Sequence, residues 1–287
     1  MSGRELPYDP RPGGRMFTDE RRQVILSTLS VHGSASVTDL ARMVRSSEIT
    51  VRRDLKALEE SGLVLRHRGG ASVGRSSMDE PSYREKAVVA AEEKLAMAAL
   101  AAELVDDGDV IMLCAGTTTQ ALAQRLTRRR LMVATNSVLV ANALFDAPDV
   151  EVFLVGGILR SNIRAVIGGE AEKAVARLRF HKVFLSGNGL TAANGLSTPN
   201  MHVASIDRAA VAAAKQVVVL ADHTKVGVDS MVQTVETERI DTLVTDDGAD
   251  RVELDRLAGA GVEVGVAQAL EALRPNADAT AAPRGGR

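Results

Sequence analysis

The chain has 287 residues, long enough for two domains that each bury a core. Its 45% apolar and 25% charged residues are typical of a globular protein, but only 2% are aromatic, which argues against binding of single-stranded nucleic acid by base stacking. The one cysteine, Cys114, excludes an intramolecular disulfide and a cysteine-cluster metal site. Because the five histidines show no metal-ligand spacing either, we expect neither a metal nor another cofactor.

Positive charge is concentrated near the start of the chain. The net charge is −2, yet residues 15–75 carry eleven Lys and Arg against seven Asp and Glu. This excess is modest support for a nucleic-acid contact in that segment. No apolar run approaches the ~20 residues that a membrane-spanning helix needs, and residues 1–15 lack the apolar stretch of a signal peptide. We therefore expect a cytoplasmic protein without a membrane partner.

The N-terminal part of the chain predicts three helices close together. Residues 1–15 show no periodicity and are expected to form a disordered tail. Apolar periodicity predicts helices over about 20–31, 39–45 and 48–60. The last two are joined by a turn as tight as that of a helix-turn-helix motif.

The third of these helices is followed by a basic hairpin. Val51, Leu55 and Leu58 lie on one side of the helix and predict its buried face. Residues 63–70 begin with a short strand signal and continue through basic residues into two glycines, without an acidic residue. A capped basic helix followed by such a hairpin predicts a winged helix-turn-helix domain over 16–72, with the third helix in the major groove of double-stranded DNA.

Candidate DNA contacts lie on the side of the third helix opposite its apolar face, and around it. Arg52 and Arg53 would reach phosphates or guanine edges. An alternative for Arg52 is an ion pair with Glu48 one turn earlier, which is worth only ~0.2–0.5 kcal/mol. The full set of candidates is Thr38, Ser47, Ile49, Thr50, Arg52, Arg53, Lys56, Arg66 and Arg68.

The rest of the chain predicts a linker, a second domain and a tail. Residues 73–82 are polar and rich in serine, and are expected to link the first domain to a second over 83–273, with a disordered tail at 274–287. After an alanine-rich helix over 83–105, apolar runs alternate with helical stretches. Several runs are apolar throughout, so we expect an α/β fold with a largely parallel sheet. The expected strands are 110–113, 132–134, 152–155, 183–185, 217–220, 243–245 and 262–266, and the expected helices are 118–127, 137–145, 170–178, 203–214 and 250–259.

Small polar residues follow several of these strands at one edge of the sheet, where ligands bind in open α/β folds. The turn at 116–119 opens a helix, so its free backbone N–H groups and hydroxyls suit a phosphate. A plain strand-to-helix turn capped by threonine is an equally open interpretation. Lys225 would neutralise a phosphate or carboxylate. The candidate ligand contacts are Gly116, Thr117, Thr118, Thr119, Thr135, Asn136, Ser137, Gly156, Gly157, Asn188 and Lys225.

The predicted DNA-binding domain carries a specific motif of about fifty residues. In this chain it reads Thr50-Val51-Arg52-Arg53-Asp54-Leu55, Leu58-Glu59, Gly62-Leu63, Arg66 and Arg68-Gly69-Gly70-Ala71. This segment resembles the N-terminal domain of DeoR-family bacterial transcription regulators. The family usually has His before the paired glycines, whereas Arg68 stands here with His67 one place earlier.

The loops of the second domain resemble the effector domain of the same family, from about residue 92 to 266. The shared segments are AGTTT at 115–119, TNS at 135–137, the glycines at 156–157, GGEA at 168–171, GNG at 187–189 and the Lys225 loop. That domain shares its fold with ribose-5-phosphate isomerase, and in the family these loops hold a phosphorylated sugar. The resemblance therefore implies a regulator, and more narrowly a repressor of carbohydrate-metabolism genes, that binds operator DNA and a small phosphorylated sugar.

Paired DNA readers are also expected. A single helix-turn-helix covers only a half-site, and linked copies gain affinity, so we expect a homo-oligomer.

The chain departs from the family pattern at four positions. Cys114 and Asn188 stand where Asp is common, and Val203 and Asp207 stand in a region that usually carries Glu followed by Lys. The isomerase chemistry of the shared fold needs a carboxylate base, and Asn188 cannot accept a proton, so we expect no enzyme. Two alternatives are a sugar-phosphate isomerase with an accessory DNA-binding module, and a regulator that responds to a nucleotide or an unphosphorylated sugar.

Overall fold

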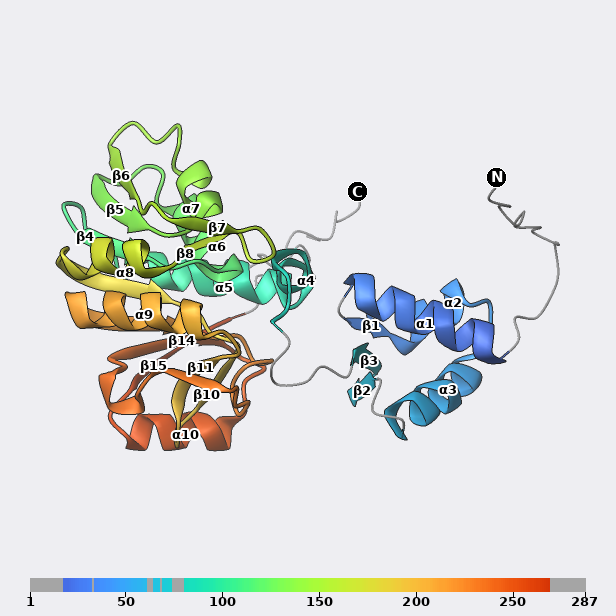
Figure 1. The fold of residues 1–287 in the computed structure, drawn as a ribbon. Helices are drawn as coiled ribbons and strands as arrows, with labels where there is room; N and C mark the ends of the chain where they lie inside the picture. Colours follow the sequence, from blue (N-terminus) through green and yellow to red (C-terminus); the bar gives the residue numbers. More distant parts are fainter. Residues whose placement is uncertain (1–17, 33, 61–63, 68, 74–79, 269–287) are drawn as a thin grey trace, which may run out of the picture. The chain divides into compact units, whose positions relative to one another are not determined.

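The chain forms two compact units, residues 1–76 and 77–287 (unit 1 and unit 2), each with its own hydrophobic core (Figure 1). The structure, a computed structural model, describes residues 18–32, 34–60, 64–67, 69–73 and 80–268. The expected tails at 1–15 and 274–287 and most of the expected linker at 73–82 lie outside the described residues. None of the described helices is long and apolar enough to cross a membrane.

Unit 1 consists of three helices and a small antiparallel sheet with the strand order β1-β3-β2. Its core is built from Ile25 and Leu29 of the first helix, Leu40 of the second and Leu55 of the third. The third helix buries the three apolar residues that the sequence places on one side, which confirms the winged helix-turn-helix prediction. Strand β1 was not predicted, because three small residues give no strand pattern. The elements are α1 (Thr18–His32), β1 (Ser34–Ser36), α2 (Val37–Met43), α3 (Glu48–Glu60), β2 (Val64–His67) and β3 (Gly70–Val73).

A residue in the left-handed backbone conformation makes the turn between α2 and α3. Arg45 has φ 47°, and its N–H donates to the carbonyl of Arg42, while the N–H of Ser46 donates to the carbonyl of Ala41. This pattern closes helix α2 and reverses the chain within four residues. A non-glycine residue in this region is strained, so Arg45 stands where glycine would be easier.

The two glycines of the wing have different roles. Gly69 has φ 94°, a conformation that side chains rarely adopt, and lies in the tight turn between β2 and β3. Gly70 pairs with Ser36 of β1, and a Cβ there would lie 2.6 Å from the carbonyl oxygen of Ala35. Gly70 therefore lets β1 approach the hairpin.

A buried carboxylate joins α3 to α1. Asp54 is 2% exposed and accepts hydrogen bonds from Nε and Nη2 of Arg21, at 2.5 and 3.2 Å. Nε of Arg22 lies 3.4 Å from the same carboxylate. Since a charge this deeply buried is stable only when paired, Asp54 fixes where α3 sits against α1.

Unit 2 is built on a seven-stranded parallel sheet with the order β15-β14-β12-β9-β4-β5-β6. All seven predicted strands are present in it, which confirms the predicted fold class. The strands are β4 (Val110–Leu113), β5 (Leu131–Thr135), β6 (Val150–Leu154), β9 (Phe180–Leu185), β12 (Ala214–Leu220), β14 (Thr242–Asp246) and β15 (Glu263–Ala267).

Helices cover both faces of this sheet (Figure 1). Ile111 and Leu113 of β4 pack with α5, α6 and α7, whereas Met112 packs on the other face with α8, α9 and α10. This alternation is the period of two along a strand. The helices are α4 (Tyr83–Val88), α5 (Ala91–Ala102), α6 (Thr117–Arg125), α7 (Val138–Ala143), α8 (Gly169–Ala176), α9 (Met201–Ala213), α10 (Arg251–Gly259) and the 3₁₀ turn η1 (Thr237–Arg239).

Two small antiparallel sheets complete unit 2 and were not predicted. One is the hairpin of β7 (Ile158–Arg160) and β8 (Ala165–Ile167), and the other has the order β10-β11-β13. Their strands are three or four residues long, too short for a clear alternation in the sequence. The strands of the second sheet are β10 (Gly189–Thr191), β11 (Gly195–Thr198) and β13 (Val232–Val235).

The single helix predicted over 83–105 is wrong, because the chain breaks there into α4 and α5. Ala90 adopts φ 49° and separates the two helices. The buried ammonium of Lys94 donates to the carbonyls of Lys86 and Val89, which have lost their helical partners at the break. A tertiary hydrogen bond therefore replaces the helical ones that local sequence favours.

The Asp54 anchor gives a stability prediction for unit 1. Asp54→Ala leaves the guanidinium of Arg21 without its buried partner and should lower the free energy of unfolding of unit 1 by about 3 kcal/mol. Hydrogen–deuterium exchange of the amides in α1 and α3 measures this loss separately from unit 2. Glu59→Ala removes the surface pair with Arg66 and should change the same value by less than about 1 kcal/mol. Equal protection in the two variants would contradict the anchoring role.

Candidate DNA-binding surface and effector site

The exposed side of α3 carries most of the predicted DNA contacts. Ile49 is 76% exposed, and Arg52, Arg53 and Lys56 are also exposed. Ser47 caps the helix by accepting a hydrogen bond from the N–H of Thr50 at 3.3 Å. An isoleucine left in water at the start of a basic helix suits contact with a thymine methyl group.

The two arginines of α3 differ in their partners. Nη2 of Arg52 lies 3.3 Å from the carboxylate of Glu48, and the hydroxyl of Thr38 donates to the same carboxylate at 2.8 Å. These two hydrogen bonds lower the pKa of Glu48. The side chain of Arg53 makes no hydrogen bond or ion pair with the residues that the structure describes. Its guanidinium is therefore available to a base edge without first breaking an internal contact.

The wing and the helix-turn-helix corner add further cations. Arg66 of β2 is exposed and pairs with Glu59 at 3.3 Å, whereas Arg68 lies outside the described residues. A hollow of about 430 Å³ at the corner is lined by Thr38 and Ser47 together with Arg42 and Arg45. The sequence argument missed these last two arginines, because the position of the turn was not known. They bring positive charge to the place where α2 meets α3.

Three loops of unit 2 meet at the carboxyl ends of its strands. Gly116 precedes α6, and a Cβ added to it would lie 3.5 Å from the side chain of Ser186. Nζ of Lys225 donates to the hydroxyl of Ser186 at 3.4 Å. The 116–119 turn, the loop after β9 and Lys225 therefore lie together and form the candidate effector site, called the effector site below.

Several predicted contacts hold the loops together. The side chain of Asn136 accepts a hydrogen bond from the N–H of Ala115 at 2.9 Å and donates to the carbonyl of Val166 at 3.2 Å. Thr119 and Thr135 donate to backbone carbonyls within or beside β4, at 2.7 Å each. Their polar atoms are thus engaged in fixing the loops.

Other predicted contacts have unused or partly used groups. The buried hydroxyl of Thr118 has no hydrogen-bond partner among the described residues. Thr117 is half-buried in the first turn of α6. Asn188 is half-buried and accepts a hydrogen bond from Thr198 at 3.3 Å, and Ser137 caps α7.

The paired glycines lie in the exposed turn between β6 and β7, against strand β8, which Asn136 also contacts. Gly157 has φ 150°, and a Cβ there would lie 2.9 Å from the carbonyl oxygen of Ile167. This glycine lets the turn pack against β8. A ligand role for Gly156 and Gly157 stays a prediction without a further contact to support it.

Two lysines lie beside one buried carboxylate at the effector site, and a third, Lys86, is close enough to Lys225 for the two charges to interact. Asp222 is fully buried, with Nζ of Lys225 at 3.2 Å and Nζ of Lys94 at 3.8 Å. Burial raises the pKa of Asp222, but the charges of both lysines and a hydrogen bond from Thr224 outweigh it, so the pKa lies below its usual value. Burial and the charge of Lys225 lower the pKa values of Lys86 and Lys94 to about 8. Lys225 and Lys94 together exceed the charge of the one carboxylate between them, which favours an anionic ligand.

Lys86 and Lys94 were not among the predicted contacts. Both belong to the alanine-rich stretch that was expected to be one helix, where lysines usually face solvent. The break at Ala90 turns α4 so that Lys86 lies close enough to Lys225 to be influenced by its charge. No group of His, Cys, Asp or Glu that could hold a metal occurs in the described part of the chain.

Two residues that depart from the family pattern lie in contact below the 116–119 turn. Cys114 and Asp207 are both buried, and their side chains lie close enough together for each to influence the pKa of the other. Burial raises the pKa of Asp207 to about 7, against a smaller downward effect of the thiol and of Lys86. Burial, followed by the neighbouring Asp207, raises the pKa of Cys114. The thiol is therefore an unreactive packing group, as expected for a buried cysteine.

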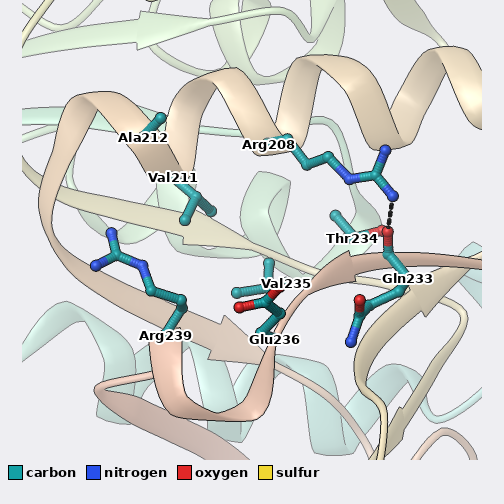
Figure 2. A pocket seen from close by; sticks show the side chains of 8 residues that line it. All are labelled: Arg208, Val211, Ala212, Gln233, Thr234, Val235, Glu236 and Arg239. Carbon is teal, nitrogen blue, oxygen red and sulfur yellow. Dashed lines mark hydrogen bonds between the residues drawn. The ribbon is translucent and has the colours of Figure 1, made fainter.

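A surface hollow of about 480 Å³ lies between α9, β13 and η1 (Figure 2). Arg208 of α9 donates a hydrogen bond to the carbonyl of Gln233, and Arg239 lines the hollow as well. Its lining contains none of the predicted ligand contacts. It plays no part in the effector site.

The raised pKa of Asp207 gives a pH prediction. The folded chain keeps this proton up to about pH 7, whereas an unfolded Asp releases it near pH 4, so stability falls as the pH rises between these values. Asp207→Asn cannot ionise, and its stability relative to the wild type should grow by roughly 2–3 kcal/mol between pH 5 and pH 8. Thermal unfolding at both pH values measures this. Asp255→Asn, at an exposed position, is the control, and its stability relative to the wild type should be the same at both pH values. If the stability of Asp207→Asn relative to the wild type also stays the same at both pH values, the assignment is contradicted.

Comparison with known proteins identifies both units. A model described as "DeoR-like helix-turn-helix domain" matches residues 21–77, and one described as "DeoR C terminal sensor domain" matches residues 89–247. The regulator GlpR of Haloferax volcanii is 37% identical over 254 residues, which cover 87% of this chain and 98% of that protein. The lactose phosphotransferase system repressor of Streptococcus mutans is 33% identical over 234 residues, covering 80% of this chain and 93% of that protein.

A solved structure of ribose 5-phosphate isomerase A from Methanocaldococcus jannaschii is similar over 47% of this chain and 54% of its own, with a TM-score of 0.36 and 16% identity. The two family models, by contrast, between them match most of the chain, and the relatives match it over nearly their full length. The chain therefore belongs to the DeoR family and is a DNA-binding regulator of transcription, not an enzyme.

Proposed function

We propose that this regulator is a repressor of carbohydrate-metabolism genes that binds operator DNA as a homo-oligomer and responds to a small phosphorylated sugar. The observation that carries the proposal is the excess of lysines around Asp222, next to the backbone N–H groups that open α6. Lysine ammonium groups and a helix start are the groups that bind phosphate in proteins. The lactose system named for one relative supports a sugar as the rest of the ligand.

In this function the two units have separate tasks. In unit 1, α3 would enter the major groove, with Arg53 on a base edge and Lys56 and Arg66 on phosphates. In unit 2, Lys225 and Lys86 would hold the phosphate, and Asn188 and Thr117 would contact sugar hydroxyls. Asn188 accepts and donates hydrogen bonds but cannot remove a proton, so the ligand would be bound without being converted.

One other ligand-site function keeps the same fold. A regulator that responds to a nucleotide or an unphosphorylated sugar would bind those compounds at least as well as sugar phosphates. The lysine cluster favours the phosphorylated ligand over an uncharged sugar, because burying cations without an anion is costly.

The roles of the basic residues of α3 can be separated by operator titration. Arg53→Ala should weaken binding to the cognate operator by about 1–3 kcal/mol and reduce the preference over a scrambled duplex, because a base contact is lost. Lys56→Ala should weaken binding to both duplexes alike and reduce the slope of affinity against salt by about one. If Arg53→Ala lowers affinity for both duplexes equally, Arg53 contacts phosphate and does not read a base.

The effector site can be tested by thermal shift with a panel of sugar phosphates and inorganic phosphate. A phosphate ligand should raise the unfolding temperature of the wild type. Lys225→Met should lower the affinity for this ligand roughly 10- to 100-fold, because it removes a charge-assisted hydrogen bond. Lys173→Met, at an exposed position of α8, is the matched control and should respond like the wild type.

Lys225 also pairs with Asp222, so its loss lowers stability in the absence of ligand. Lys86→Met removes another cation of the site without breaking an ion pair that the structure shows. This variant should also bind the same ligand with lower affinity. Operator titration with and without that ligand then shows whether DNA affinity changes. Unchanged ligand affinity in both variants would place the phosphate site elsewhere.

A further inference from the structure

Strand β6 forms an uncovered edge of the main sheet of unit 2. It pairs only with β5, on one side, in the described sheet. It is the one strand of the seven with no buried residue, whereas the opposite edge strand, β15, is packed against α5 and α10. A free strand edge exposes a row of backbone N–H and C=O groups that can pair with another strand.

The side chains around this edge are apolar. Phe145 is 83% exposed, Ile158 71% and Phe153 44%, and four more large apolar side chains of the same region are exposed. We call the seven together the edge patch: Met132, Val138, Phe145, Phe153, Leu154, Ile158 and Leu159. Soluble monomers rarely leave two phenylalanines and an isoleucine of one region in water, so the patch indicates a contact surface.

These residues lie around one edge. Met132 and Phe153 lie on the same face of neighbouring strands, because β5 and β6 pair in register from Leu131 and Val150 onward. Helix α7, which packs on β5 and β6, begins with Val138, and Phe145 lies two residues after its end. Ile158 and Leu159 follow β6 directly, on β7.

The size of the patch fits a dimer interface. Added together, the exposed fractions of the seven residues equal nearly four fully exposed side chains. At roughly 150–250 Å² for a large side chain, this is an exposed apolar area on the order of 600 Å². A standard interface buries about 800 Å² on each partner. The exposed backbone of β6 and a polar rim would supply the remainder.

We propose that the edge patch is the surface by which unit 2 binds a second copy of this chain, with the two β6 strands side by side about a twofold axis. A twofold axis brings the same patch of each copy together, so the phenylalanines of one copy meet those of the other. The free strand edges are also complementary, because antiparallel strands exchange N–H and C=O groups in pairs. A pair of such units carries two readers, as a palindromic operator requires.

This proposal rests on the homo-oligomer of the proposed function and locates its interface, and the oligomeric mass in solution tests it without any need for DNA or ligand. An oligomeric wild type with an unaffected Phe153→Glu variant overturns the edge patch alone, whereas a monomeric wild type overturns the homo-oligomer as well. Light scattering coupled to size exclusion should show an oligomer for the wild type at micromolar concentration. Phe153→Glu should reduce the mass by at least half, because a carboxylate would be buried in an apolar contact. Val252→Glu makes the same kind of change at an exposed position of α10 and should keep the wild-type mass. An unchanged mass for Phe153→Glu, or a monomeric wild type, overturns the proposal.

A cross-linking experiment covers the case in which Phe153→Glu does not fold. The native Cys114 is 1% exposed, so an introduced surface cysteine is the reactive one. Under mild oxidation Phe153→Cys should form a covalent dimer within minutes, whereas Val252→Cys should form one only slowly through random collisions. Equal rates of dimer formation for the two variants would contradict contact at β6.

Discussion

The arrangement of the effector site depends on the buried carboxylate of Asp222. A charge with no exposure to water must be neutralised nearby, and Lys225 and Lys94 do this from two different segments of the chain. Lys94 in turn binds the carbonyls left free where α4 ends, so the helix break and the lysine cluster form together. One aspartate thereby fixes the loop after β12, the start of α5 and the direction of α4.

The regular parts of the fold could be predicted from local sequence. The strand at 110–113 matches β4 residue for residue, because four apolar residues between a glycine turn and a glycine-threonine turn have few alternatives as a buried strand. The third helix was equally clear from its cap and its apolar spacing. In both places, propensity, pattern and tertiary packing favour the same conformation.

What could not be predicted depends on contacts between distant segments. Nothing near Ala90 indicates a left-handed residue, and the break is compensated by Lys94 further along the chain. Cys114 and Asp207 were each noted as unusual, but their contact joins a strand end to a helix 93 positions later. Candidate ligand residues such as Asn136 were placed at the correct edge of the sheet, yet most of their hydrogen-bonding groups hold the loops together. Sequence showed where polar groups gather, and only the structure shows which remain available.

The position of α4 has a consequence for how a signal leaves unit 2. This short helix carries Lys86 into the site, and it is the first helix after the stretch that comes from unit 1. Just before it, the carboxylate of Glu80 pairs with Arg160 at 3.0 Å and accepts a hydrogen bond from Asn200 at 3.0 Å, which ties that stretch to the end of β7 and to the start of α9. An anion bound by Lys86 would therefore act on the same short segment of unit 2 that Glu80 holds in place, at the point where the chain enters this unit.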